Sequence, residues 1–381
     1  MTSPRALWIG TYPKAGAGTP AGLGEGVWSV RLDPASGALS GARLAAASPA
    51  PSFVVAHPGG RVLYAVGEQT AGTVTAFAAG PDGELGALAV VSSGGADPCH
   101  LLLAADARTL YVANYSSGTL GVLPLDADGA FARETIAAGG PVQLLEHTGC
   151  GPDAARQDGP HAHFAAFAPG GAHLLVVDLG TDEIRRYKVA PDGRLAADGI
   201  ASTLPPGTGP RHLVVGPAAD GAASGHPIYL VGELDATVRV LRWDAASATA
   251  ALAQTLPACL TPRRSGDGVY PAHLVLDGGR LLVSVRGADT LAEFAVDART
   301  GLLEPAGEAD TGCWPRHFAV VDGVAVVANQ VSGTLTALRG RAPGPVQRRG
   351  AGSATAVVAI PAPACVVPAR NGRGTGERWV G

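Results

Sequence analysis

The stretch PCHLLLAADARTLYVANYSSGTLGVL, residues 98–123, contains the unit from which most of this chain is built. A Pro-x-His opening leads into an apolar strand, a tight turn, a second apolar strand that ends in polar residues, and an alternating third strand. The same pattern, or a close relative of it, opens at Phe53, His100, His163, His212, His273 and His317. A more polar fourth segment follows each copy, and four strands repeated about every 45 to 60 residues are typical of propeller blades.

The two ends of the chain together supply a seventh copy. Residues 7–12 and 26–39 match the second and third strands of the unit, with no first strand before them, and residues 363–369 resemble that missing strand. We therefore expect an all-β, seven-bladed β-propeller, closed by pairing of the C-terminal strand into the N-terminal blade, which leaves no exposed sheet edge. The expected domain spans residues 1–370, with a flexible tail at 371–381, an insertion at 139–160 and a lengthened turn at 216–227.

Composition and charge exclude several classes of function. Hydrophobic residues make up 46% of the chain and charged residues 16%, which suits a large core. The net charge of -4 comes without any run of Lys or Arg, so neither a nucleic-acid nor a membrane partner is expected. No segment has the apolar length of a signal peptide or a membrane span, which predicts a cytoplasmic protein. We expect a monomer or a weak homodimer.

The five cysteines are scattered and include no C-x-x-C pair that would indicate a zinc or redox site. We expect reduced, buried or half-buried thiols. Cys99 and Cys313 lie beside the repeated histidines, so a Cys-His nucleophile is kept as a minor alternative. The histidines come from different blades without a compact ligand motif, and no Gly-rich phosphate loop precedes a helix, so neither a metal nor a cofactor is expected.

The blade pattern itself gathers polar side chains. Because the chain runs down the first strand and back up the second, the start of one and the end of the other lie at the same edge of the sheet. The ionisable residues at these positions include His161, His163, Asp178, Arg211, His212, Glu233, His273, Arg286, Arg316 and His317. Such a set can hold an anionic substrate and orient a base. Each histidine could instead bind a neighbouring blade, and Asp178 could equally cap a turn.

Three strings together resemble a known family. They are R-Q-x-x-P-H-A-H at residues 156–163, D-L-G-T-D at 178–182 and G-P-R-H at 209–212. The chain resembles the seven-bladed propeller lactonases, the bacterial-type 6-phosphogluconolactonases and their carboxymuconate lactonising relatives, over nearly its whole length. The resemblance implies that His163, Arg211, Glu233 and Arg286 are the catalytic residues. Asn often precedes this Glu and the later Arg in the family, whereas this chain has Gly232 and Val285.

The resemblance implies hydrolysis of a sugar lactone, with 6-phospho-D-glucono-1,5-lactone as the leading substrate. Either His163 or Glu233 would accept a proton from water, while Arg211 and Arg286 would hold the phosphate or the developing oxyanion. The expected substrate-binding residues are His161, His212, His273, Arg316, His317 and Asp178. Two alternatives stay open: a muconate-type lactonising cycloisomerase, and a non-enzymatic propeller that binds a protein partner.

Overall fold

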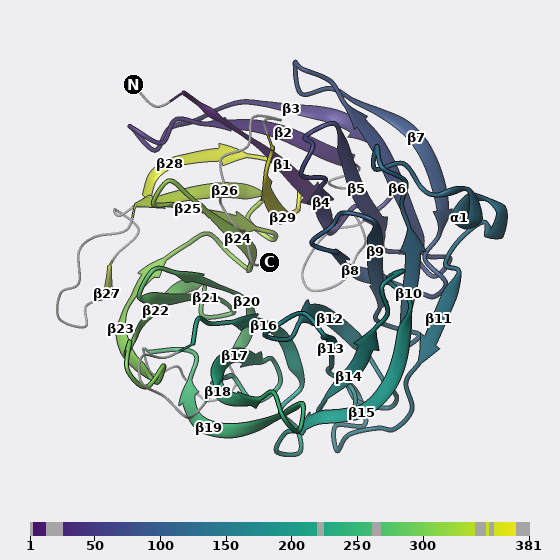
Figure 1. Ribbon diagram of the computed structural model, residues 1–381. Helices are drawn as coiled ribbons and strands as arrows, with labels where there is room; N and C mark the ends of the chain where they lie inside the picture. Colours follow the sequence, from purple (N-terminus) through teal and green to yellow (C-terminus); the bar gives the residue numbers. More distant parts are fainter. Residues whose placement is uncertain are drawn as a thin grey trace. The chain divides into compact units, whose positions relative to one another are not determined.

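The computed structural model describes residues 3–12, 26–218, 225–260, 268–339, 348–349 and 354–370. These residues fall into two compact units, each of which is considered by itself. Within the described residues the strands form seven sheets, each with four antiparallel strands (Figure 1). This arrangement confirms the predicted all-β fold of seven blades. The expected tail at 371–381 lies outside the described residues, and the expectation of a single domain stays a prediction.

The first unit contains four blades. Blade 1 has the strand order β29-β1-β2-β3, blades 2 and 3 follow chain order, and blade 7 has the order β24-β25-β26-β28. The strands of these blades are β1 (Arg5–Thr11), β2 (Gly26–Leu32), β3 (Leu39–Ala47), β4 (Val54–Ala56), β5 (Val62–Gly67), β6 (Thr73–Ala79), β7 (Leu85–Ser92), β8 (Pro98–Leu103), β9 (Thr109–Asn114), β10 (Thr119–Pro124), β11 (Gln143–Glu146), β24 (Pro315–Val321), β25 (Val324–Asn329), β26 (Thr334–Arg339), β28 (Ala354–Ala359) and β29 (Pro363–Pro368).

The second unit contains blades 4, 5 and 6, which follow one another in chain order. Blade 6 carries one additional short strand, β27, which pairs in parallel with the outer strand β23. The strands of this unit are β12 (Ala162–Phe167), β13 (His173–Asp178), β14 (Glu183–Val189), β15 (Leu195–Thr203), β16 (Pro210–Val215), β17 (His226–Gly232), β18 (Thr237–Asp244), β19 (Thr249–Pro257), β20 (Tyr270–Asp277), β21 (Arg280–Arg286), β22 (Thr290–Val296), β23 (Leu303–Asp310) and β27 (Arg348–Arg349).

The C-terminal strand completes the N-terminal blade, as the sequence predicts. Strand β29 pairs antiparallel with β1, with Trp8 opposite Val367 and Ile9 opposite Val366. In Figure 1 the yellow β29 lies beside the purple β1. The backbone edge of β1 is therefore paired rather than exposed.

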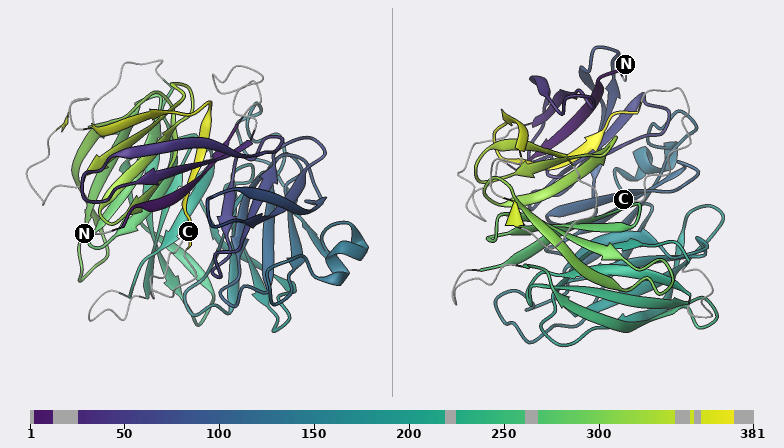
Figure 2. Two further views of the ribbon diagram at one scale, coloured as in Figure 1. Left: turned by 90° about the horizontal axis from the view of Figure 1, so that it is seen from above. Right: turned by 90° about the vertical axis from the view of Figure 1, so that its left-hand side faces the viewer.

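The predicted insertion at 139–160 is wrong in its first half. Residues Gln143–Glu146 form β11, which pairs with β10 and supplies the fourth strand of blade 3. This strand comes late in the sequence because a short helix, α1 (Arg133–Ala138), lies between it and β10. Figure 2 shows α1 projecting beyond the strands beside it. The lengthened turn expected at 216–227 falls partly outside the described residues, which resume at residue 225.

A β-bulge marks the start of the first strand in six blades, including blade 1, where the register shifts across Ala364 of β29. The pairing register shifts across His163 in blade 4, Ala272 in blade 6 and Arg316 in blade 7. It also shifts at Cys99 in blade 3 and across Arg211 and His212 in blade 5. A bulge places an extra residue on one strand and turns its side chain out of the regular alternation. Proline suits this position, because it donates no hydrogen bond to the ladder.

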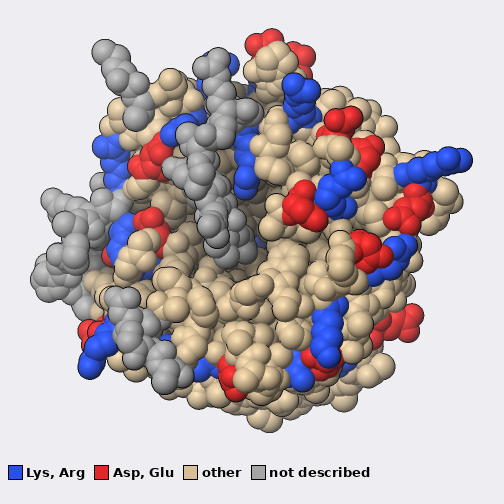
Figure 3. All heavy atoms as spheres, in the orientation of Figure 1, with Lys and Arg blue, Asp and Glu red and all other residues tan. Residues whose placement is uncertain are grey.

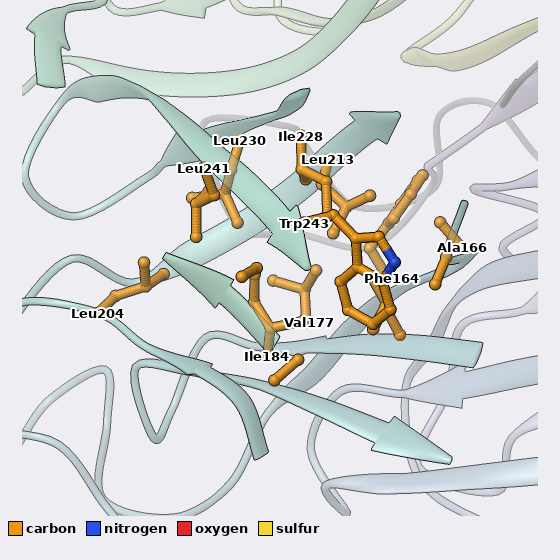
Figure 4. Close-up of a cluster of buried hydrophobic side chains, with 14 of the residues drawn as sticks. Phe164, Ala166, Val177, Ile184, Leu204, Leu213, Ile228, Leu230, Leu241 and Trp243 are labelled. Atoms are coloured by element: carbon orange, nitrogen blue, oxygen red, sulfur yellow. The ribbon is translucent and has the colours of Figure 1, made fainter. Parts of the chain in front are cut away.

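Alternating apolar side chains bury the inner strands on both faces. In β17, Ile228 and Leu230 pack in the cluster shared with blade 4, whereas Tyr229 and Val231 pack in the cluster shared with blade 6. Figure 4 shows the first of these clusters, where Phe164 and Trp243 lie close together. Because interiors are packed as densely as organic crystals, these contacts fix the ends of the strands that carry the polar residues.

The distribution of surface charge and the length of the helix are relevant to binding of nucleic acid or a membrane. On the face seen in Figure 3, described Lys and Arg side chains lie among Asp and Glu rather than in one basic patch. In the described part of the chain, α1 is the only helix, and its six residues are far too few to cross a bilayer. The expectation that neither nucleic acid nor membrane binds this chain stays a prediction.

The closing strand offers a test of stability. We expect Val366→Ala, at a side chain that is 1% exposed in the core of blades 1 and 7, to lower the free energy of unfolding by about 1.5–3 kcal/mol, because it removes buried apolar surface. Val357→Ala, at a side chain that is 60% exposed in the same unit, is the matched control and should change it by less than about 0.5 kcal/mol. Urea denaturation measures the free energy of unfolding of both variants. Equal decreases in the two variants would contradict the role of β29 as a stabilising strand.

Candidate active site

The four residues expected to be catalytic all lie in the second unit, at the ends of inner strands. His163 is the bulged residue of β12, and Arg211 follows the first residue of β16. Glu233 comes directly after β17, and Arg286 is the last residue of β21. The antiparallel pairing brings these strand ends to one edge of blades 4, 5 and 6. The structure therefore brings the predicted residues together.

Glu233 is the centre of this cluster. Its Oε2 atom lies 2.7 Å from Arg211 Nε and 2.8 Å from Arg286 Nη2, and its Oε1 atom lies 2.7 Å from Arg156 Nη2. Arg211 and Arg286 are fixed further by backbone carbonyls, since Arg211 donates to Ala272 O and Arg286 Nε donates to Tyr270 O at 3.1 Å. One carboxylate is thus surrounded by three guanidinium groups.

The electrostatics of the cluster keep Glu233 ionised. Burial alone would raise the pKa of this carboxyl, but the nearby charges of Arg286, Arg211 and Arg156, together with His163, hold it well below 4.5. One negative charge against three arginines leaves the cluster with a net charge of about +2 at neutral pH. Such an excess attracts an anion or an oxygen atom that gains negative charge during a reaction.

Arg156 is the residue that the sequence analysis missed. It lies on the loop between β11 and β12, outside the repeated pattern, as the first residue of the R-Q-x-x-P-H-A-H string. Gln157 holds this loop, because its buried amide donates to Leu179 O and to Asp182 Oδ1, each at 2.9 Å. The presence of Arg directly before this Gln is the only sequence signal that could have indicated the role.

Three imidazole rings extend from the cluster. The rings of His163 and His212 lie edge to face with centroids 5.3 Å apart, and those of His212 and His273 do so at 5.2 Å. The Nδ1 atoms of His212 and His273 are 2.9 Å apart, so one ring donates and the other accepts a hydrogen bond. Two of the expected substrate-binding histidines are therefore engaged with each other beside His163.

Asp178 has the geometry of the turn-capping alternative. Its Oδ1 atom accepts hydrogen bonds from the backbone amides of His161, Gly180 and Thr181 at 2.8–3.1 Å, and its Oδ2 atom lies 2.5 Å from His147 Nδ1. Gly180 is needed in this turn, because a Cβ atom there would lie 1.9 Å from Gly159 O. The side chain of Asp178 is fully buried, and its expected role in substrate binding stays a prediction.

Arg316 and His317 lie in the first unit, where they have other contacts. The guanidinium of Arg316 lies 4.8 Å from the centre of the Tyr12 ring, and its Nη1 atom donates to Gln330 Oε1 at 3.5 Å. His317 Nδ1 accepts a hydrogen bond from the backbone amide of Val366 in β29 at 3.3 Å. His317 thus links two neighbouring blades, as the structural alternative for the repeated histidines requires.

The Glu233 ion pairs predict a pH-dependent stability. Glu233→Gln should lower the free energy of unfolding at pH 7 by about 3–5 kcal/mol, because it leaves buried arginines uncompensated. Since the folded protein lowers the pKa of Glu233, its stabilisation is present above pH 4.5 and is lost as the pH falls through the lower folded value. The difference in free energy of unfolding between the wild type and Glu233→Gln, measured by urea denaturation, should therefore become smaller below pH 4.5.

A matched control is Glu84→Gln, which removes an exposed carboxylate 3.8 Å from Arg43. It should lower the free energy of unfolding at pH 7 by no more than about 1 kcal/mol. If Glu233→Gln lowers the free energy of unfolding by the same amount from pH 7 to pH 3, the stabilisation does not come from the ionised carboxylate of Glu233.

Comparison with known proteins identifies the family of the chain. The family model described as "Lactonase, 7-bladed beta-propeller" matches residues 6–368. A 6-phosphogluconolactonase of Bacillus subtilis is 32% identical, with 86% of this chain and 89% of that protein aligned. The crystal structure of a protein from Lactobacillus plantarum has a TM-score of 0.80 at 27% identity and covers 96% of this chain and 99% of its own. The periplasmic gluconolactonase of Pseudomonas aeruginosa has a TM-score of 0.79 at 29% identity, with 96% and 99% covered. The chain therefore belongs to the lactonase family of seven-bladed β-propellers, which makes it a lactone hydrolase.

Proposed function

We propose that this protein hydrolyses 6-phospho-D-glucono-1,5-lactone to 6-phosphogluconate at the cluster around Glu233. The observation that carries the proposal is the meeting of Arg156, Arg211 and Arg286 on one buried carboxylate. The excess positive charge suits a substrate that carries a phosphate and whose carbonyl oxygen becomes an oxyanion. The B. subtilis relative is named for the same reaction.

His163 is the proposed general base. The arginines hold the pKa of Glu233 so far below neutrality that its carboxylate would be a weak proton acceptor. An imidazole that is neutral near physiological pH can accept a proton from water. This consideration favours His163 over Glu233, the two candidates that the sequence left open. Glu233 then serves to fix Arg211 and Arg286 in place.

The proposed reaction needs no covalent enzyme intermediate. A water molecule attacks C1 of the lactone while His163 takes one of its protons, and the carbonyl oxygen becomes an oxyanion stabilised by Arg211 and Arg286. The intermediate then collapses with cleavage of the bond between C1 and the ring oxygen. The imidazolium of His163 returns its proton to that oxygen, which yields the open acid and a free hydroxyl group.

The cellular location and the oligomeric state of the protein stay predictions from the sequence. The expected cytoplasmic site of action is not established by family membership, because the P. aeruginosa relative is described as periplasmic. The expected monomer or weak homodimer likewise stays a prediction. The sugar lactone is the partner that the family supports, and its phosphorylation is the finer part of the proposal.

The base assignment predicts a loss of activity. His163→Ala should lower kcat by about 10²–10⁴-fold, the usual contribution of a positioned general base. The measurement is a coupled assay of 6-phosphogluconate release from freshly made lactone, with the spontaneous rate subtracted. His173→Ala is the control, because His173 begins β13 and contacts Asp198 at 3.1 Å, outside the proposed site. Retention of wild-type kcat by a folded His163→Ala variant would contradict the mechanism.

The same preparation distinguishes the alternative activities. A muconate substrate, followed by its ultraviolet absorbance, should be converted no faster than in buffer. Conversion of muconate without hydrolysis of the sugar lactone would support the cycloisomerase instead. Failure of the folded wild-type protein to convert either compound would support a non-enzymatic scaffold.

A further inference from the structure

The three arginines around Glu233 differ in their access to solvent. The side chains of Arg211 and Arg286 are 3% and 5% exposed, and both are also held by backbone carbonyls of blade 6. The side chain of Arg156 is 37% exposed and contacts Glu233 through the other carboxylate oxygen, Oε1. Two arginines are therefore built into the interior, whereas the third reaches the same carboxylate from the solvent side.

The loop that carries Arg156 is held firmly by its own residues. The amides of Arg156 and Gln157 donate to Asp153 O at 3.1 and 2.6 Å, and the amide of Ala155 donates to Asp153 Oδ1 at 2.9 Å. The side chain of Gln157 is buried and hydrogen-bonded to Asp182. The base of Arg156 is thus fixed while its guanidinium lies at the solvent boundary.

Asp182 connects this loop to the strand that carries Arg211. Its Oδ1 atom accepts hydrogen bonds from Gln157 Nε2 at 2.9 Å and from the amide of Gly209 at 2.8 Å. Gly209 directly precedes β16, whose second residue is Arg211. One shared carboxylate therefore ties together the backbone segments that carry Arg156 and Arg211.

The substrate has two ends with different requirements. The lactone carbonyl needs buried donors, because hydrogen bonds to a developing oxyanion are strongest where water is excluded. The phosphate is a fully ionised, strongly hydrated group, and burying it completely would carry a large desolvation cost. A half-exposed guanidinium can bind phosphate through two parallel hydrogen bonds while water remains on the other oxygens.

We propose that Arg156 is the specificity residue that selects the phosphorylated lactone, by binding its phosphate at the solvent boundary of the Glu233 cluster. This inference rests on the proposed function and refines it, because it divides the three arginines by task. Arg211 and Arg286 act at the carbonyl, and Arg156 acts at the phosphate. It also accounts for a cation that approaches Glu233 from outside the repeated blade pattern.

The test compares two substrates that differ only in the phosphate. For Arg156→Ala, kcat/KM with 6-phospho-glucono-1,5-lactone should fall by about 10- to 100-fold, the range of one charge-assisted hydrogen bond. With glucono-1,5-lactone it should fall by less than about fivefold, as for loss of a partly exposed ion pair. The loss should lie mainly in KM, because the phosphate is distant from the bonds that change. Arg156→Lys keeps the charge and should lose less with the phosphorylated substrate.

The matched control is Arg194→Ala, which removes a 43% exposed arginine that contacts Asp192 at 2.8 Å in the turn before β15. It should leave both values of kcat/KM unchanged. Inorganic phosphate gives an independent readout: it should inhibit hydrolysis of 6-phospho-glucono-1,5-lactone competitively in the wild type, with an inhibition constant about tenfold or more higher in Arg156→Ala. Circular dichroism spectra establish that each variant is folded.

The outcomes separate this inference from the proposed function. Equal losses with both lactones in Arg156→Ala would overturn the inference, because Arg156 would then act only through Glu233. Unchanged kinetics with both lactones would overturn it as well. Wild-type protein that hydrolyses neither lactone would overturn the proposed function, and the inference with it, and this failure is recognised before any variant is measured.

Discussion

The buried carboxylate of Glu233 is the constraint on which the arrangement of the site depends. Arg211 and Arg286 are nearly inaccessible to water, and neither could be buried as an isolated charge without a large desolvation cost. Glu233 compensates both through one oxygen atom and leaves the other for Arg156. The same contact that permits the arginines to be buried also determines where their remaining donors can act on a substrate.

The blade architecture supplies this constraint through a local irregularity. Regular alternation along β12, β16 and β20 would send successive side chains into the apolar clusters on the two faces of each sheet. The bulges near the strand starts interrupt that alternation directly after Pro210 in blade 5 and Pro271 in blade 6, and at His163 in blade 4. Polar residues are therefore released from the core at the edge where the second strand ends in Glu233 or Arg286.

Much of this could be predicted from the sequence, because strand periodicity and turn residues are local signals. They indicated seven blades, the shared N- and C-terminal blade, and the gathering of Arg211, Glu233 and Arg286. They failed where the structure departs from the repeat. Strand β11 was assigned to an insertion because α1 delays it, and Arg156 was given no role because its loop has no counterpart in other blades. A contact between a loop and a distant strand end produces no periodic pattern in the sequence.

The repeated histidine shows most clearly why a repeated residue type does not determine function. His163 and His317 lie near the starts of equivalent strands, and both are buried, but His163 is the bulged residue of its strand, whereas in blade 7 that position is held by Arg316. His317 accepts a hydrogen bond from Val366 and packs its ring against Phe53 at 5.7 Å, so its environment is that of a link between blades. His163 lies instead within the field of Glu233 and its arginines. The bulge at His163 and the surrounding charges, which come from other blades and from a loop, together make this histidine a candidate base.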